Sequence, residues 1–253
     1  MCRLFGAVSG GPLAYDLLEG FADLAVTGNT ASGRPDGRGH RDGWGLALFY
    51  GGKLELYERG PGSARGSPEY SRAARTIAGT GVDPREGDRL VVVGHVRRAS
   101  DGLPVGAEWS HPFVETRGGR TWAFAHNGGI DHFPFHEDEG LIDSQQLLRK
   151  LLRNLDGPEL GEIAPAVASM VDEVRREYSR YTALNFLLAD GERLHAFREY
   201  TEHPDYYTLY YDDSREAVIV CSQPIRHMRG TPVSKGSLLS TGPGLGITLR
   251  QVV

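Results

Sequence analysis

Apolar residues recur along the chain with two different periods, and each period predicts a different kind of element. Four segments have the helical period of three to four residues, and they begin at Pro12, at Ser67-Pro68, at Asp143 or Ser144, and near Pro158, the last running to Tyr178. Proline in the first turn and a serine or aspartate cap favour a helix start at such places. The pattern therefore predicts two helices in the first third of the chain and two near its middle.

Short apolar runs, and apolar residues that alternate with polar ones, predict strands. The predicted strands cover residues 2–9, 43–50, 53–59, 90–97, 121–126, 183–190, 193–200, 206–211 and 217–222, followed by a weak pair at the C-terminus. Gly51-Gly52 predicts a hairpin turn, whereas the segment 29–41, rich in Gly, Pro and Asp, predicts a loop. Strands, then helices, then strands again, without a repeat or linker, predict one layered α+β domain over residues 1–253.

Composition and charge exclude several classes of protein. Of the 253 residues, 40 % are apolar and 24 % are charged, which differs from a disordered chain. The net charge of −5 argues against a general nucleic-acid binder, and no run reaches the roughly 20 apolar residues of a membrane helix. The N-terminus lacks the apolar core of a signal peptide, and Cys2 and Cys221 do not make a disulfide framework. We therefore expect a cytoplasmic protein with free thiols that binds neither nucleic acid nor membrane.

Cys2 directly follows the initiator Met, and this position gives it chemistry that an internal cysteine lacks. Methionine aminopeptidase removes Met before small residues such as Cys, which would leave Cys2 with a free α-amine. An α-amine titrates near neutral pH and suits general base catalysis, so the base and the nucleophile would share one residue. The alternative is a buried structural cysteine, which is common for this residue type.

Three later segments add candidate chemistry, and each has a structural alternative. Arg97 ends the strand LVVVGHVR and offers a planar fork for a carboxylate, with an exposed ion pair as the alternative. Asn127 and Gly128 follow the strand TWAFA and offer two donors for an oxyanion hole, with an Asn-Gly turn as the alternative. Asp143 either binds a substrate ammonium group or only caps a helix.

The order of these segments resembles the class-II glutamine amidotransferases, a branch of the N-terminal nucleophile hydrolases. Besides the opening MCRLFG, the matching motifs are HVRRAS at 95–100, His-Pro at 111–112, His-Asn-Gly at 126–128, Asp-Ser at 143–144 and Ser-x-Pro at 222–224. Together these motifs span nearly the whole chain. Asp-Gly-Trp-Gly at 42–45 is typical of the small stand-alone members, which include the γ-glutamyl hydrolase of ergothioneine synthesis.

This resemblance implies a four-layer αββα sandwich and a set of functional residues, without a cofactor or a metal. The implied catalytic residues are Cys2, Asn127 and Gly128, and the implied substrate-binding residues are Arg97, Arg98, Ser100 and Asp143. The cysteine would attack the γ-carbonyl of glutamine or of a γ-glutamyl conjugate to form a thioester, while the asparagine side chain and the glycine N–H stabilise the oxyanion. Arg97 would bind the α-carboxylate and Asp143 the α-ammonium group, and backbone groups around residues 98–100 would line the glutamyl pocket.

Two residues depart from the family pattern, and alternatives to a hydrolase stay open. Gln145 stands where many relatives have Glu, and Arg98 stands where Trp or another hydrophobe is frequent, which leaves acceptor and substrate size open.

The chain could instead be a glutaminase subunit that passes ammonia to a separate synthase, or a non-catalytic glutamine-binding module. A zinc site at His132 and His136 is disfavoured because Pro134 interrupts the helix that would present both, so a metal hydrolase ranks last.

Overall fold

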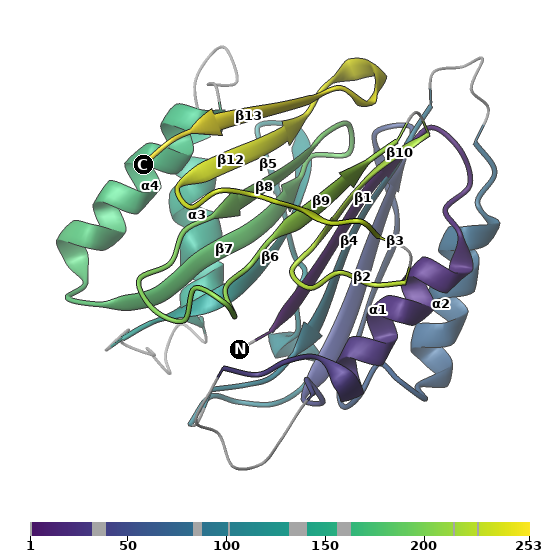
Figure 1. Cartoon of the computed structure of the whole chain (residues 1–253), viewed down its shortest axis with the longest axis horizontal. Helices are drawn as coiled ribbons and strands as arrows, with labels where there is room; N and C mark the ends of the chain where they lie inside the picture. The colour runs from purple at the N-terminus through teal and green to yellow at the C-terminus, as the bar shows by residue number, and fades with distance from the viewer. Residues whose placement is uncertain are drawn as a thin grey trace.

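Two antiparallel sheets and four α-helices stack as four layers (Figure 1). A computed structural model describes residues 2–31, 39–82, 88–100, 102–131, 141–155, 163–214, 216–226 and 228–253. The helices in these ranges are α1 (Tyr15–Thr27), α2 (Pro68–Gly79), α3 (Asp143–Leu155) and α4 (Ile163–Glu177). Helices α1 and α2 cover one sheet, and α3 and α4 cover the other. The αββα sandwich that the resemblance implies is confirmed.

The two sheets are called A and B here, and every strand pairs with its neighbours in antiparallel fashion. Sheet A has the order β11 (Thr231–Pro232), β9 (Tyr210–Asp213), β10 (Ala217–Cys221), β1 (Arg3–Ser9), β4 (Leu90–Arg97), β2 (Gly43–Tyr50) and β3 (Lys53–Gly60). Sheet B has the order β13 (Ile247–Gln251), β12 (Ser237–Thr241), β8 (Leu194–Arg198), β7 (Tyr181–Ala189), β6 (Arg120–Ile130) and β5 (Phe113–Arg117). Short 3-10 helices lie at Ala107–Trp109 and Pro243–Leu245.

Each boundary between layers has its own apolar core. On β1, Phe5 packs in the cluster between sheet A and its helices, whereas Leu4 packs in the cluster between the two sheets. This follows from the alternation of side chains along a strand. A third cluster joins sheet B to α3 and α4 and includes Phe124 and Phe186. The same alternation directs Asn127 on β6 and Asn185 on β7 toward the space between the sheets, next to Ala125 and Leu187 of the inter-sheet core.

Most predicted elements are confirmed, with shifts at their ends. Strands β2 and β4 have the predicted bounds, and the Ser67 hydroxyl caps α2 by accepting a hydrogen bond from Tyr70 N at 3.1 Å. The predicted fourth helix corresponds to α4, whose described part begins at Ile163, and residues 156–162 lie outside the described residues. The predicted loop 29–41 is described only at its two ends. Strand β5 was not predicted.

Two local predictions are wrong. The strand predicted at 206–211 is replaced by β9, because Tyr206 and Tyr207 belong to a turn in which Tyr206 N donates to His203 O at 2.9 Å. The strand predicted to end at residue 126 continues to Ile130 as β6, where it pairs with β7. The Asn127-Gly128 pair therefore lies within a sheet, and the hairpin turn that was its structural alternative does not form.

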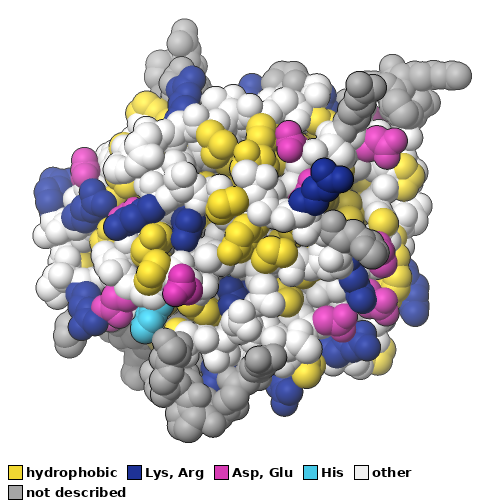
Figure 2. All heavy atoms as spheres, in the orientation of Figure 1, with side chains coloured by type: hydrophobic (Ala, Val, Ile, Leu, Met, Phe, Trp, Pro, Cys, Tyr) yellow, Lys and Arg dark blue, Asp and Glu magenta, His cyan; other side chains and the backbone are white. Residues whose placement is uncertain are grey.

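Surface charge and the apolar length of helices can indicate a ligand or a membrane. Acidic and basic side chains are interspersed across the face shown in Figure 2. Within the described ranges, no helix has the length and apolar character needed to cross a membrane. No group of three or more His, Cys, Asp or Glu side chains in the described part of the chain could hold a metal ion, while His132 and His136 lie outside it.

Candidate active site

Cys2 lies just before β1, at the end of sheet A marked N in Figure 1, and touches both sheets. Its backbone nitrogen donates a hydrogen bond to Asn127 Oδ1 on β6 at 2.9 Å. Its Sγ lies 3.7 Å from the carbonyl oxygen of Arg98, which follows β4. Only 8 % of the Cys2 surface is exposed, and the residue lies where the start of β1, the segment after β4 and strand β6 meet. The structure thus brings Cys2, Arg98 and Asn127 together.

Asn127 presents an unpaired donor beside Cys2. Its amide orientation follows from Cys2 N, which is a donor and therefore requires Oδ1 to face it. The fully buried Nδ2 then has no hydrogen-bond partner in the described part of the chain. Leaving a buried donor unpaired costs roughly 1–3 kcal/mol, which favours a ligand acceptor at this point. The neighbouring Gly128 has no room for a side chain, since a Cβ would lie 1.8 Å from Ala183 O.

Asp143 begins α3 and is held by backbone groups. Its Oδ2 accepts from Ile130 N at 3.2 Å, and its Oδ1 accepts from Ser144 N at 2.7 Å and from the Ser144 hydroxyl at 3.2 Å. Asp143 is the first helical residue, so it satisfies one free N–H of the first turn, while the preceding Ile142 is the N-cap. A carboxylate has about four acceptor sites, so one remains for an ammonium group. Gln145 Oε1 accepts from Ile142 N at 3.1 Å. This departure from Glu keeps the acceptor that a capping box uses.

Arg97 is the last residue of β4 and is buried, with 2 % of its surface exposed. Its Nη1 donates to Pro104 O at 2.8 Å, and no ion pair of Arg97 is present among the described residues, so its burial there is not that of an exposed ion pair. The segment after it is anchored to Asp42, whose nitrogen donates to Arg97 O at 2.9 Å and whose Oδ2 accepts from Ala99 N at 2.8 Å. Ser100 is half-buried and lies in the same anchored segment.

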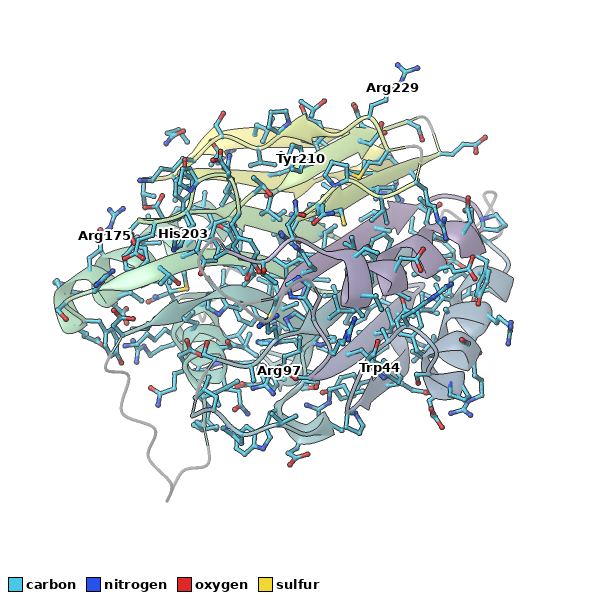
Figure 3. All side chains as sticks on the ribbon, turned by 60° about the horizontal axis from the view of Figure 1, so that its bottom comes forward. Trp44, Arg97, Arg175, His203, Tyr210 and Arg229 are labelled. Carbon is cyan, nitrogen blue, oxygen red and sulfur yellow. The ribbon has the colours of Figure 1, made fainter. Side chains whose placement is uncertain are left out.

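The Asp-Gly-Trp-Gly motif packs against the His-Pro motif. A Cβ on Gly43 would lie 2.0 Å from Ser110 Oγ, and a Cβ on Gly45 would lie 2.2 Å from His111 O. Both positions therefore exclude a side chain because of close approach. Figure 3 labels Trp44, between these glycines, and Arg97, and β2 pairs Gly43 with Arg97. Two motifs that the sequence separates thus meet beside the end of β4.

Three buried histidines surround this junction, and all are neutral. Burial lowers the pKa of His126, although Asp143 opposes the shift. His126 Nε2 lies 3.3 Å from Ala183 O, and Nδ1 lies 2.9 Å from Ser144 Oγ, whose hydroxyl also lies 3.2 Å from Asp143 Oδ1. Burial also lowers the pKa of His95 and of His111, whose rings lie 4.3 Å apart. The hydrogen-bond partner of Cys2 Sγ among the described residues is a carbonyl, so no histidine is placed as its base.

Sequence reasoning did not single out three residues at this site. The Tyr206 hydroxyl donates to the carbonyl oxygen of Cys2 at 3.2 Å. Asn185 lies opposite Asn127 in the β6–β7 ladder, and its buried Nδ2 also has no partner within the described ranges. Arg3 donates to carbonyl groups of three separate segments. No sequence pattern marks these contacts, because their partners are distant in the chain.

Ser222 belongs to the Ser-x-Pro motif, to which the sequence assigns no function. Its Oγ accepts from Leu4 N at 2.9 Å, and its own nitrogen donates to Leu4 O at 3.0 Å. The late Ser-x-Pro motif therefore fixes the start of β1, two residues from Cys2. The second cysteine, Cys221, is fully buried and free.

Comparison with known proteins supports a common origin. The family model for class-II glutamine amidotransferases matches residues 1–230. Escherichia coli YafJ, which is named as a glutamine amidotransferase, is 29 % identical over 209 residues, covering 78 % of this chain and 72 % of that protein. A Haemophilus influenzae protein of the same description is 28 % identical over 161 residues, which are 60 % of this chain and 50 % of that protein.

Solved structures show the same fold at lower sequence identity. A class-II domain protein from Silicibacter pomeroyi aligns with a TM-score of 0.62 and 20 % identity, covering 99 % of both chains. The glutamine phosphoribosylpyrophosphate amidotransferase of Bacillus subtilis aligns with a TM-score of 0.66 and 16 % identity, over 100 % of this chain and 49 % of that one. With the family match over residues 1–230, these findings show that the chain is an enzyme of the class-II glutamine amidotransferase family.

Proposed function

We propose that this chain, acting as one domain, hydrolyses the γ-amide of glutamine or of a γ-glutamyl conjugate through a thioester on Cys2. The observation that supports this most directly is the arrangement of Asn127. Its Oδ1 holds the nitrogen of Cys2 at 2.9 Å, while its buried Nδ2 has no partner among the described residues. One side chain thereby orients the base and offers a donor to the oxyanion.

In the first half of the reaction, the free α-amine of Cys2 takes the thiol proton. The thiolate attacks the γ-carbonyl carbon, and the carbonyl electron pair moves to oxygen, where Asn127 Nδ2–H and the Gly128 N–H donate to it. The tetrahedral intermediate collapses, and the C–N bond breaks. The leaving amine takes the proton from the α-ammonium group, which leaves a thioester and a neutral α-amine.

In the second half, water replaces the departed amine. The α-amine removes a proton from this water as it attacks the thioester carbonyl, and the same two donors stabilise the second oxyanion. Collapse breaks the C–S bond, and the thiolate of Cys2 takes the proton back from the α-ammonium group. The γ-carboxylic acid that forms is released and loses its proton to water. With Met1 still attached, the nitrogen of Cys2 would be an amide and could not accept a proton, so the mechanism requires removal of Met1.

The remaining candidate residues would bind the amino acid head group. Arg97 would pair with the α-carboxylate and Asp143 with the α-ammonium group, while Arg98 and Ser100 contribute backbone groups to the glutamyl pocket. Support comes from their position, because Arg98 O contacts Cys2 Sγ and Asp143 accepts from Ile130 N on the same strand as Asn127. Hydrogen bonds to charged groups contribute about 1.5–3 kcal/mol each.

The two cysteines provide a matched test of this function. Ammonia or amine release is measured with glutamine and with a series of γ-glutamyl amides, for the wild type, Cys2→Ala and Cys221→Ala. Burial raises the pKa of Cys221 to about 11, so this thiol is inert at neutral pH and its variant serves as the control. We expect Cys2→Ala to lose all turnover and Cys221→Ala to retain it.

Other outcomes would support different functions. Turnover by Cys2→Ala would contradict the thioester mechanism. A wild type that binds glutamine without releasing ammonia would support the binding module. Turnover that rises only when a synthase is added would support a subunit that delivers ammonia to a partner.

A further inference from the structure

The nucleophile belongs to a residue that the sheet does not hold. Strand β1 begins at Arg3, so Cys2 lies outside the hydrogen-bonded ladder. Removal of Met1 would leave this residue with a single peptide bond, and chain ends fray unless they are tied down. The contact with Asn127 fixes the nitrogen but not the carbonyl side of Cys2. A second anchor is therefore needed to fix the thiol and the α-amine relative to each other and to the substrate.

Tyr206 contacts the other side of the same residue. Its hydroxyl donates to the Cys2 carbonyl oxygen at 3.2 Å, and the contact is buried. Burial raises the pKa of the Tyr206 phenol, which keeps the hydroxyl protonated and able to donate. Tyr206 comes from the turn that starts at His203, labelled in Figure 3, after β8 of sheet B. Asn127 of sheet B thus anchors the nitrogen of Cys2, and the connection between β8 and β9 anchors its carbonyl.

Tyr206 is itself held in place from several directions. The Arg3 guanidinium lies over its ring, 4.3 Å from the centroid, and Arg3 Nη1 donates to Tyr206 O at 3.3 Å. Arg3 also donates to Ser222 O at 3.4 Å and to Asn29 O at 2.6 Å. The Tyr207 ring meets the Tyr206 ring edge-on at 5.0 Å. The hydroxyl of Tyr206 is therefore a fixed donor rather than a mobile one.

We propose that Tyr206 is a positioning residue for the nucleophile, and that its hydroxyl fixes the carbonyl of Cys2 so that the thiol and α-amine keep the geometry for attack. The inference rests on the proposed function. Small errors in the placement of reacting groups lower the rate of the chemical step. Because the proposed head-group contacts come from Arg97 and Asp143, loss of the Tyr206 hydroxyl should lower kcat and leave KM almost unchanged.

Tyr207 provides a matched control in the same turn. It is also buried, with 1 % of its surface exposed, and its ring packs against that of Tyr206. Its hydroxyl donates to Thr182 Oγ1 at 2.9 Å and not to Cys2. Tyr206→Phe and Tyr207→Phe therefore each remove one buried hydroxyl from one turn, and only the first removes a contact to the nucleophile.

The test measures kcat, KM and Tm for both variants with glutamine, after mass spectrometry confirms that Met1 is absent. We expect Tyr206→Phe to lower kcat about tenfold or more with KM within about twofold, and Tyr207→Phe to keep kcat within about twofold. Placing 4-aminophenylalanine at position 206 restores a donor of similar reach and should recover most of kcat. A Tyr206→Phe variant with kcat within about twofold of wild type would overturn the inference, as would equal losses in the two variants.

A second variant covers the case in which Tyr206→Phe does not fold. Arg3→Lys keeps the charge but loses the planar group that lies over Tyr206, and it should also lower kcat more than it changes KM. Unchanged kcat in a folded Arg3→Lys protein would count against the inference. The wild type separates the two proposals. A wild type that neither turns over glutamine nor forms a covalent adduct on Cys2 with an electrophilic glutamine analogue would refute the proposed function. An active wild type with an unaffected Tyr206→Phe variant would refute only the role of Tyr206.

Discussion

At the scale of single residues, the amide of Asn127 has two ends with different duties. Its oxygen accepts from Cys2 N, and its nitrogen is a buried donor without a partner in the described part of the chain. Holding Cys2 N therefore requires only an acceptor, whereas stabilising the oxyanion requires a donor. A substitution that keeps the oxygen and removes the nitrogen separates these two roles.

Asn127→Asp makes this change. The carboxylate still accepts from Cys2 N, but it places a negative charge where the oxyanion develops. Loss of one oxyanion-hole donor costs about 10²–10³ in kcat, and the acquired charge should bring the variant to the upper end of that range. KM should change much less, because the lost interaction forms only in the transition state. Steady-state kinetics with glutamine checks the prediction.

The control is that the variant still folds and binds. We expect a Tm near that of the wild type and retained binding of glutamine by calorimetry. An Asn127→Asp protein with kcat within about threefold of the wild type would remove Asn127 from the oxyanion hole.

At the scale of elements, the close approach of β6 and β7 explains a glycine in the middle of a strand. A Cβ on Gly128 would lie 1.8 Å from Ala183 O, a backbone atom that cannot move without parting the strands. The next residue, Gly129, has Thr182 Oγ1 at 3.7 Å as the nearest neighbour of such a Cβ. Adjacent glycines in one strand therefore differ sharply in what they tolerate.

The difference in space at these two glycines is tested by measuring the stability of Gly128→Ala and of Gly129→Ala. Overpacking costs about 1–3 kcal/mol, so Gly128→Ala should lower the free energy of unfolding by about 3 kcal/mol or more. It should also displace Asn127 and abolish most activity. Gly129→Ala should change the free energy of unfolding by less than about 0.5 kcal/mol. Chemical denaturation of both variants checks this, and equal stabilities would show that β6 and β7 approach less closely at Gly128.

The elements that the sequence predicts well are those with a strong local pattern. Strand β4 is an unbroken apolar run, and the leucines of α3 form one buried stripe, so periodicity locates both. Local sequence patterns predict the wrong element where contacts with residues distant in the chain determine the backbone conformation. The Asn-Gly pair favours a turn on its own, but pairing with β7 keeps it extended. The tyrosine-rich run at 206–211 favours a strand, but Tyr206 N and Tyr207 N donate to His203 O in a turn.

The candidate site shows the same limit. Cys2, Asn127, Gly128 and Arg98 were expected from ordered motifs, and the structure places them where the start of β1, the segment after β4 and strand β6 meet. Tyr206 could not be expected, because its contact with Cys2 joins residues 204 positions apart and no motif surrounds it. Its position depends on the packing of a turn, which the local pattern does not encode.

At the scale of the whole molecule, buried neutral histidines make stability depend on pH. His195 on β8 lies at the end of sheet B opposite Asn127, with Nδ1 2.8 Å from Ser240 Oγ. Burial lowers its pKa to about 4, against the ordinary value of 6.5, although Asp190 opposes the shift. The unfolded chain therefore binds a proton that the folded chain does not, and stability is lost as pH falls from about 6.5 toward 4.

His195→Gln removes this titration while keeping a side chain that can hydrogen-bond to Ser240. A pKa difference contributes about 1.4 kcal/mol per pH unit within its window, so the wild type should lose about 2 kcal/mol more than His195→Gln between pH 7 and pH 5. Chemical denaturation of both proteins at the two pH values measures this. Equal losses would show that His195 takes up its proton in the folded state.

The proposed mechanism depends above all on a processed N-terminus whose cysteine attacks the substrate. The most direct measurement is peptide mass spectrometry of the purified protein after incubation with 6-diazo-5-oxo-norleucine, an electrophilic analogue of glutamine. We predict that Met1 is absent, that one adduct forms per chain, and that it lies on Cys2 and not on Cys221. Stoichiometric labelling or full glutamine turnover by protein that retains Met1 would contradict this mechanism, as would an adduct on any other residue.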